Sequence, residues 1–178
     1  LIGPKAQHIE MMGDKVAARQ ALDQLGIPLV PGSEGIVDSF HTAQRIAGEI
    51  GYPVLVKAVA GGGGRGMRVA SSANELELEF AVARREASEA FGNDQVYIEK
   101  YLPNPRHIEL QIMADSTGDV VHFGERDCSI QRRHQKILEE APSPLLSEEL
   151  RADICLRAVS AVQKLGYLGA GTLEFLFQ

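Results

Sequence analysis

Tryptophan is absent from this sequence of 178 residues, and cysteine occurs only twice, at Cys128 and Cys155. The two cysteines do not form a Cys-x-x-Cys pair, which argues against a zinc site and against a disulfide framework. We interpret both as free thiols in a reducing compartment. No apolar run approaches the roughly 18 residues of a membrane-spanning helix, and no signal peptide is apparent, so no membrane association is expected.

Positive charge is also scarce, because 18 lysine and arginine residues face 24 aspartate and glutamate residues and leave a net charge of −6. This balance argues against general nucleic-acid binding, although local cations still allow an anionic ligand. The apolar share of 44% supports a hydrophobic core, and the charged share of 24% is ordinary for a soluble globular protein. The length fits one domain, or one domain and part of another.

Glycine, by contrast, is concentrated in residues 57–67, where four consecutive glycines lie between Lys57 and Arg65. Glycine lets the backbone lie against a ligand, and backbone N–H groups form concavities that bind anions. A Walker A loop is excluded because its lysine follows the glycines. Strand-like residues begin at Met67, so the sequence predicts a strand–loop–strand flap over nucleotide phosphates. A flexible hairpin loop without a ligand is the alternative.

Capping residues and apolar stripes predict four helices, which begin after Asp14, Ser39, Ser72 and Ser147 and end near residues 25, 50, 91 and 165. Ser72 and Glu75 together match a capping box. Lys15 stands in the first turn of the first helix, where the helix dipole disfavours a cation. Lys15 is therefore either a solvated lysine or a residue that serves an anion.

Alternating apolar and polar residues predict strands over residues 95–101 and 107–113, and short apolar runs predict strands over residues 54–57, 120–123 and 173–177. In chain order, residues 107–113 and 120–123 are the third and fourth strands. The third of these is expected to pair antiparallel with the fourth, because a turn over residues 115–119 joins them. In the third strand, His107, Glu109 and Gln111 share one face. This face is either simply solvated or the floor of a site beneath the glycine flap.

Two further features concern charge. Residues 125–136 are dense in arginine, lysine and histidine, which bind oxyanions. This run is a solvated basic loop, a nucleic-acid patch, or an anion-substrate site, and the lack of interleaved aromatic residues weakens the second option. Glu174 lies in an apolar strand, and it either faces solvent or binds Mg²⁺, an ion held through one or two carboxylates and substrate phosphates.

Together these segments resemble biotin carboxylase, the ATP-grasp component of biotin-dependent carboxylases. The resembling segments follow one another in order through nearly the whole chain: residues 12–15, 51–58, 61–67, 98–102, 104–109, 125–136 and 169–175. The resemblance implies an α+β, ATP-grasp fold. In it, residues 1–28 lead into the fold, 29–101 form a small lid subdomain with the glycine-rich loop, and 102–178 start a larger antiparallel-sheet subdomain.

The resemblance also implies a reaction and a set of site residues. Biotin is carboxylated by bicarbonate with MgATP, through carboxyphosphate, to give ADP and phosphate. Lys136, near bicarbonate, and His134 are the implied catalytic residues, and Glu174 is the implied ligand of Mg²⁺ or Mn²⁺. The implied nucleotide-binding residues are Lys15, Lys57, Gly62, Gly63, Gly64, Gly66, Met67, Glu99, Lys100, Tyr101, Leu102, His107 and Gln131.

Within that set, the resemblance implies that Lys15 and Lys57 contact the phosphates of the nucleotide and that Glu99 and Leu102 border its adenine. It places His107 and Gln131 near the ribose. Its implied partners are a biotin carboxyl carrier protein or domain, a carboxyltransferase subunit or domain, and bicarbonate, in a homodimeric enzyme of the cytoplasm or mitochondrial matrix.

In the family, a second metal carboxylate, the catalytic base and further arginines come later in the chain. We therefore expect a fragment that is inactive alone. Two alternatives are a carbamoyl-phosphate synthetase type of ATP-grasp ligase, against which residues 132–136 argue, and a non-catalytic nucleotide-binding module.

Overall fold

The computed structural model of the chain describes residues 3–60, 65–133 and 135–178. Within these residues the chain forms five α-helices and seven β-strands. Their bounds are α1 Ala6–Gly13, α2 Lys15–Gln24, α3 Phe40–Ile50, β1 Val54–Ala58, β2 Met67–Ala70, α4 Ala73–Phe91, β3 Val96–Lys100, β4 Arg106–Ala114, β5 Val120–Arg132, β6 Gln135–Glu140, α5 Glu148–Leu165 and β7 Gly169–Phe177. Of the helices in the described part of the chain, none combines the length and the apolarity needed to cross a membrane.

These elements group into two compact units. Unit 1 comprises the described parts of Leu1–Gly13, Ala21–Pro28 and Asn104–Gln178, and unit 2 comprises those of Asp14–Gln20 and Leu29–Pro103. Each unit has its own antiparallel sheet and its own hydrophobic core.

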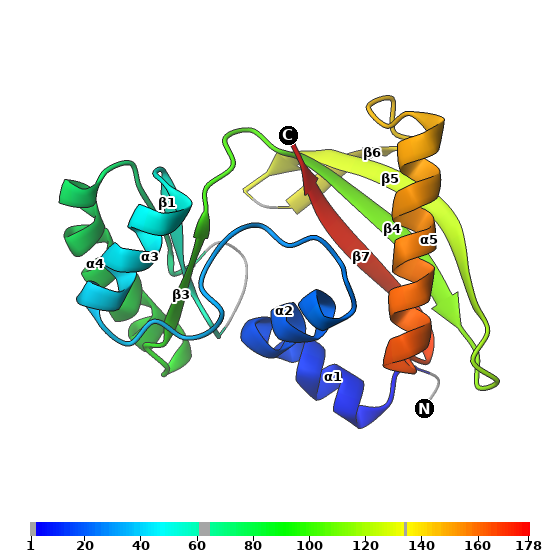
Figure 1. Cartoon of the computed structure of the whole chain (residues 1–178), viewed down its shortest axis with the longest axis horizontal. Coiled ribbons are helices and arrows are strands. Elements are labelled where there is room, and N and C mark those ends of the chain that lie inside the picture. Colours follow the sequence, from blue (N-terminus) through cyan, green and yellow to red (C-terminus); the bar gives the residue numbers. More distant parts are fainter. Residues whose placement is uncertain (1–2, 61–64, 134) are drawn as a thin grey trace. The chain divides into compact units, whose positions relative to one another are not determined.

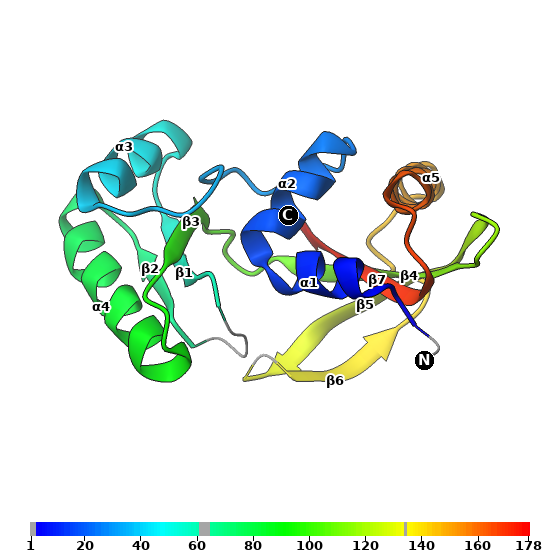
Figure 2. The same ribbon diagram turned by 90° about the horizontal axis from the view of Figure 1, so that it is seen from below.

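Unit 2 is built on a three-stranded sheet in the order β2-β1-β3, in which β1 pairs antiparallel with both neighbours. Helices α3 and α4 lie on one side of this sheet (Figures 1 and 2). Apolar side chains of both helices and all three strands form the core between them. The sheet therefore holds the two ends of the glycine loop in place, because β1 precedes that loop and β2 follows it.

Helix α4 shows how the sequence specifies this packing. The predicted stripe of Leu76, Phe80, Ala83 and Ala87 recurs at helical spacing, and all four side chains are buried. The helix ends at Gly92, which adopts the left-handed conformation with φ 69°, as glycine does at a helix C-terminus. The prediction of this helix and of its inward face is confirmed.

The capping box predicted at the start of α4 is wrong. The Ser72 side chain makes no capping hydrogen bond. The N–H of Glu75, which a capping box would join to the Ser72 hydroxyl, donates instead to the Ser72 carbonyl oxygen at 3.2 Å. The Glu75 carboxylate reaches one residue further back than expected and accepts from the N–H of Ser71 at 2.9 Å.

The other predicted caps are present. Asp14 Oδ1 accepts from two backbone N–H groups of α2, at 2.8 and 3.1 Å. Ser39 and Ser147 each accept from a backbone N–H in the first turn of their helices. Helix α1 was not predicted, because it is only eight residues long and buries a single side chain, His8.

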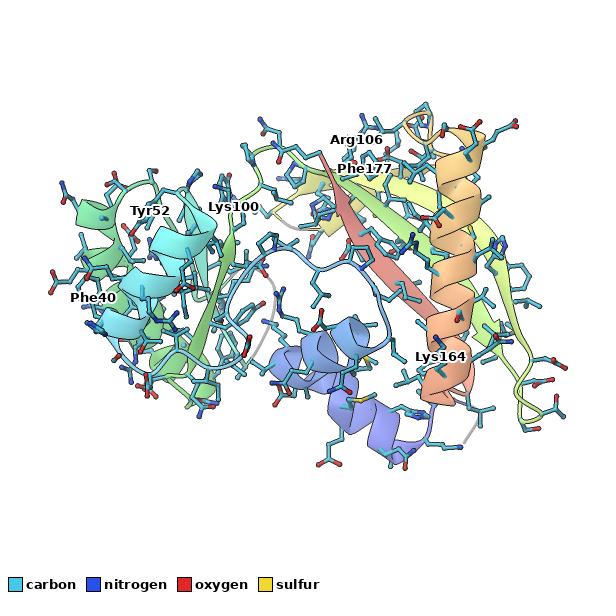
Figure 3. The ribbon with its side chains drawn as sticks, viewed as in Figure 1. Phe40, Tyr52, Lys100, Arg106, Lys164 and Phe177 are labelled. Carbon is cyan, nitrogen blue, oxygen red and sulfur yellow. The ribbon has the colours of Figure 1, made fainter. Side chains whose placement is uncertain are left out.

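Unit 1 is built on a four-stranded antiparallel sheet in the order β6-β5-β4-β7. Helix α5 lies along one face of this sheet (Figure 2), where its buried side chains form a core with those of Leu110 and Ile112. The long pairing of β4 with β7 begins where Arg106 lies opposite Phe177 (Figure 3). The predicted apolar face of β4 is therefore confirmed, and its polar face lies on the other side of the sheet.

Two segments differ from the predicted elements. Most of residues 125–136, for which a loop was one interpretation, belongs to the paired strands β5 and β6. Strand β7 begins at Gly169 rather than near residue 173, because its first residues pair with the end of β4. Glycine and alanine have low strand propensity, so the sequence alone gave no sign of this extension.

Strand β3 is buried on both faces, although alternation predicted one apolar and one polar face. Residues on both faces, including Tyr97 and Glu99, are buried. The backbone of residues 31–37 runs beside β3 and forms bridges at Gly32 and Val37. A Cβ on Gly32 would lie 2.5 Å from the Ile98 carbonyl oxygen, so this close approach requires glycine.

Candidate functional site

In unit 2, three cationic side chains gather near one buried carboxylate, that of Glu99. Glu99 lies on β3 and is 6% exposed. The Lys57 ammonium, from the neighbouring strand β1, donates to Glu99 Oε1. Arg19 Nη1, from α2, lies 3.7 Å from Glu99 Oε2. Each oxygen of this carboxylate therefore faces a different cation.

Lys15 supplies the third cation of this group. Its ammonium donates to the carbonyl oxygen of Ala58, the last residue of β1, at 3.2 Å. Burial lowers the pKa of Lys15, and the nearby charge of Lys57 lowers it further, while Glu99 opposes the change. We call Lys15, Arg19, Lys57 and Glu99 the cation cluster; with three cations and one carboxylate, it carries an excess of positive charge that attracts an anion.

Arg19 was missed at the sequence level. It lies one helical turn after Lys15 on α2, so the two side chains share a helix face. Arg19 Nη2 also donates to the carbonyl oxygen of Val30 at 2.8 Å, which fixes the guanidinium beside Glu99. The spacing of four residues from Lys15 was the signal that pointed to it.

Of the predicted residues of the glycine loop, only Gly66 and Met67 lie within the described part of the chain. Gly62, Gly63 and Gly64 lie outside the described residues. Gly66 is buried with φ 66°, and a Cβ there would lie 2.8 Å from the Ala58 Cβ, so a side chain would be strained and crowded. Met67, at the start of β2, pairs with Lys57.

The predicted adenine segment, residues 99–102, begins in the last two residues of β3 and continues beyond it. Lys100 directs its side chain to unit 2's own backbone, where its ammonium donates to the carbonyl oxygens of Gly51 at 3.0 Å and Tyr52 at 2.8 Å (Figure 3). The N–H of Tyr101 donates to the Pro53 carbonyl oxygen at 3.1 Å. Tyr101 and Leu102 are both partly exposed. These hydrogen bonds join the segment to residues 51–53, which directly precede β1.

In unit 1, charged residues from all four strands of the sheet form a row on its polar face. Glu109 on β4 lies opposite Arg126 on β5 and opposite Glu174 on β7. Two carboxylates directly opposite each other on adjacent strands are destabilising unless a cation lies between them. Lys136 is that cation: its ammonium donates to Glu109 Oε2 and lies 3.2 Å from Glu174 Oε1. We call these four residues the carboxylate row.

The pKa shifts in the carboxylate row follow from these contacts. Burial would raise the pKa of Glu109, but the hydrogen bonds from Lys136 and Arg126 outweigh burial and lower it. Burial would lower the pKa of Lys136, but the hydrogen bond to Glu109 and the charge of Glu174 outweigh it and raise the pKa. Both side chains are therefore held in their charged forms.

The remaining predicted residues of unit 1 lie at different distances from the row. His107 Nδ1 is 3.2 Å from Glu174 Oε1, so His107, Lys136 and Glu174, three of the predicted site residues, lie close together. The Gln131 side chain instead donates to the Cys128 carbonyl oxygen at 3.2 Å. His134 lies outside the described residues. Arg126 was missed at the sequence level as an individual residue, although it lies in the basic run that was singled out.

The carboxylate row also offers oxygen donors for a metal ion. Both oxygens of Glu109 are engaged by cations, whereas the Glu174 side chain is 46% exposed. Mg²⁺ prefers carboxylate oxygens and keeps several water or phosphate ligands, so one exposed carboxylate fits a partial set of its ligands. Among the residues that the structure describes, no three acidic, histidine or cysteine side chains are grouped as a metal site.

Comparison with known proteins decides the family. The model of the carbamoyl-phosphate synthase L chain, ATP binding domain, matches residues 14–178. The chain belongs to this family. Its fold is an ATP-grasp fold, and its sequence resembles biotin carboxylases over nearly its whole length.

Three similar proteins illustrate the match. Biotin carboxylase 1 of Populus trichocarpa is 58% identical over 175 residues, which are 98% of this chain and 33% of that protein. A crystal structure of the biotin carboxylase domain dimer of Hydrogenobacter thermophilus 2-oxoglutarate carboxylase, with MgADP, ADP and bicarbonate, has a TM-score of 0.93 and 50% identity over 98% of this chain and 38% of that one.

The third is the Campylobacter jejuni biotin carboxylase in a β,γ-ATP complex, with a TM-score of 0.93 and 50% identity over 98% of this chain and 39% of that one. The chain thus spans between a third and two fifths of the length of these proteins.

Proposed function

We propose that this chain is the ATP-binding portion of a biotin carboxylase, a ligase that carboxylates biotin with bicarbonate and MgATP and releases ADP and phosphate. The proposal is carried by the excess positive charge of the cation cluster and by the exposed Glu174 carboxylate of the carboxylate row, in a chain that is 50–58% identical to proteins of that name. An excess of cations suits phosphates, and an exposed carboxylate suits the metal that accompanies them.

In this proposal, the cation cluster binds the nucleotide phosphates. Phosphoryl transfer depends mainly on positioning and on charge stabilisation. Lys15 and Lys57 contact the phosphates, and residues 62–67 close over them as a lid. Lys57 then exchanges its contact with Glu99 for a phosphate oxygen, while Arg19 keeps the carboxylate partly neutralised. Glu99 and residues 100–102 border the adenine.

The carboxylate row is proposed to serve the metal and bicarbonate. Glu174 is a ligand of Mg²⁺ or Mn²⁺, an ion that supplies charge stabilisation to the transferring phosphoryl group when it is bound. Lys136 binds bicarbonate with its ammonium, which is kept charged by the two glutamates. His107 and Gln131 lie on the ribose side of the nucleotide, and His134 completes the catalytic pair with Lys136.

The organisation around this site is proposed from the relatives. Residues 29–101 form the lid subdomain, residues 102–178 form the first part of the larger subdomain, and residues 1–28 lead into both. The biotin is carried by a biotin carboxyl carrier protein or domain, and a carboxyltransferase uses the product, for example in fatty acid biosynthesis. The enzyme is a homodimer of the cytoplasm or of the mitochondrial matrix.

The test is bicarbonate-dependent release of ADP by the full-length protein, measured with and without free biotin. We expect biotin to stimulate release, and we expect residues 1–178 alone to give none. Release stimulated by ammonia, with formation of carbamoyl phosphate, would instead support a carbamoyl-phosphate synthetase type of ligase. Nucleotide binding without any turnover of the full-length protein would support a non-catalytic module.

A further inference from the structure

Within the carboxylate row, Arg126 on β5 contacts Glu109 but not Lys136. Its Nε donates to Glu109 Oε1 at 2.9 Å, and its Nη2 donates to the same oxygen. Nη2 also donates to Gln111 Oε1 at 3.3 Å, and Nε lies 3.4 Å from Glu139 Oε2. The guanidinium is thus fixed by acceptors on β4 and β6, and its side chain is only 28% exposed.

In this arrangement the two carboxylate oxygens of Glu109 have different hydrogen-bond partners. Oε1 is engaged by Arg126, and Oε2 is left for Lys136. Without the guanidinium, both oxygens of Glu109 become available to one ammonium. Lys136 is then drawn toward β4 and away from Glu174, from which it is now 3.2 Å distant.

We propose that Arg126 is a positioning residue for Lys136, which sets the place of the Lys136 ammonium by holding the Glu109 carboxylate in one orientation. The inference rests on the proposed function, in which Lys136 binds bicarbonate. Arg126 touches neither substrate nor metal in this account and acts only through Glu109.

A lysine cannot replace this arginine fully. The planar guanidinium presents several N–H donors in a fixed fork, whereas an ammonium is a point charge on a flexible stem. Arg126 uses that fork to hold Glu109 and Gln111 at once. Arg126→Lys keeps the charge but loses the fixed direction, and Arg126→Met keeps the approximate bulk but loses both.

The experiment compares these two variants with the wild type in the full-length protein. The bicarbonate KM is measured from ADP release at saturating ATP, and the nucleotide Kd is measured by calorimetry. We expect Arg126→Met to raise the bicarbonate KM about tenfold, the effect of weakening one hydrogen bond to a charged group. Arg126→Lys should raise it less, and the nucleotide Kd should change by less than about twofold in both.

Arg151→Lys is the matched control. Arg151 on α5 donates to Glu125 at 2.7 Å, and Glu125 precedes Arg126 on β5, so this pair lies on the other face of the same sheet. We expect this control to lower the melting temperature without raising the bicarbonate KM. An equal rise of the KM in the control would show a general loss of sheet integrity and would overturn the positioning role.

The other outcomes are also decisive. An active wild type with an unchanged bicarbonate KM in both Arg126 variants overturns this inference and leaves the proposed function standing. A wild type without bicarbonate-dependent ADP release overturns the proposed function, and the inference falls with it. If Arg126→Met does not fold, Arg126→Lys still decides, because its retained charge maintains the pairing with Glu109.

Discussion

Glu99 in unit 2 and Glu109 in unit 1 have the same local arrangement. Each glutamate lies on a strand, and the two are 6% and 7% exposed. In each, one carboxylate oxygen accepts from a lysine and the other faces an arginine. A buried carboxylate is costly without such partners, so each glutamate holds its lysine at a defined place in the absence of ligand.

The two groups differ in the residue that completes them. Lys15 adds a third cation near Glu99, whereas Glu174 adds a second carboxylate next to Lys136. The first group therefore has surplus positive charge and the second has an exposed carboxylate. In the proposed function, the same lysine–glutamate–arginine arrangement therefore serves different ligands: phosphate in the cation cluster, and a metal ion together with bicarbonate in the carboxylate row.

The largest expected effect comes from removing Lys57, the lysine of the cation cluster that donates to Glu99. We expect Lys57→Ala to weaken ATP binding to the full-length protein by about 1.5–3 kcal/mol, the scale of a hydrogen bond to a charged group. Calorimetry measures the change. The matched control is Arg45→Ala, which removes an exposed cation of unit 2 that pairs with Glu49. Unchanged ATP affinity in Lys57→Ala would show that this lysine has only a structural role near the end of β1.

Removing the lysine of the carboxylate row should affect the other ligand. We expect Lys136→Ala to leave ATP affinity nearly intact and to raise the bicarbonate KM by about tenfold or more, because one charge-assisted contact is lost. Steady-state ADP release at varied bicarbonate measures this. If only ATP binding suffered, the assignment of Lys136 would be wrong.

The comparison also predicts different responses to alkaline pH. Burial and Lys57 lower the pKa of Lys15, while Glu109 and Glu174 outweigh burial and raise that of Lys136. As the pH rises, Lys15 therefore loses its charge before Lys136 does. We expect nucleotide affinity to fall by about a few-fold as the pH approaches the ordinary pKa of lysine. This is about the effect of losing one exposed charge contact.

Calorimetric titrations across that pH range check this prediction. The decline should be absent in Lys15→Met, whose affinity is already reduced at neutral pH. Lys136→Met should keep the wild-type pH profile. A Lys15→Met protein that still shows the full alkaline decline would contradict the role assigned to Lys15.

The smallest effect is expected from Arg19. Its guanidinium is 3.7 Å from Glu99 and also bound to a backbone carbonyl, so it contributes charge at a longer distance than Lys57. We expect Arg19→Met to weaken nucleotide binding by about two- to fivefold, with a smaller effect in high salt, because salt screens such a partly exposed charge. A stronger loss than in Lys57→Ala would reverse the order of the two cations.

Much of the fold could be predicted from local signals. The caps at Asp14, Ser39 and Ser147 and the apolar stripe of α4 marked helices because these features act over a few residues. Helix α1 and the start of β7 could not be predicted, because a short helix and a glycine-rich strand are fixed by tertiary contacts rather than by propensity.

The candidate site was predictable in part for the same reason. His107, Glu109 and Gln111 were assigned to one strand face, and the period of two made this possible. The pairing of Glu99 with Lys57 joins residues 42 positions apart, and strand register, which the sequence does not state, brings them together. Arg19 and Arg126 gain their roles only through such long-range contacts.

The most direct test of the two-cluster account measures nucleotide Kd and bicarbonate KM side by side for Lys57→Ala and Lys136→Ala in the full-length protein. The account predicts a reciprocal pattern. Lys57→Ala raises the nucleotide Kd more than the bicarbonate KM, and Lys136→Ala does the reverse. If both variants raised both constants to the same extent, the assignment of nucleotide binding to the cation cluster and of bicarbonate binding to the carboxylate row would be contradicted.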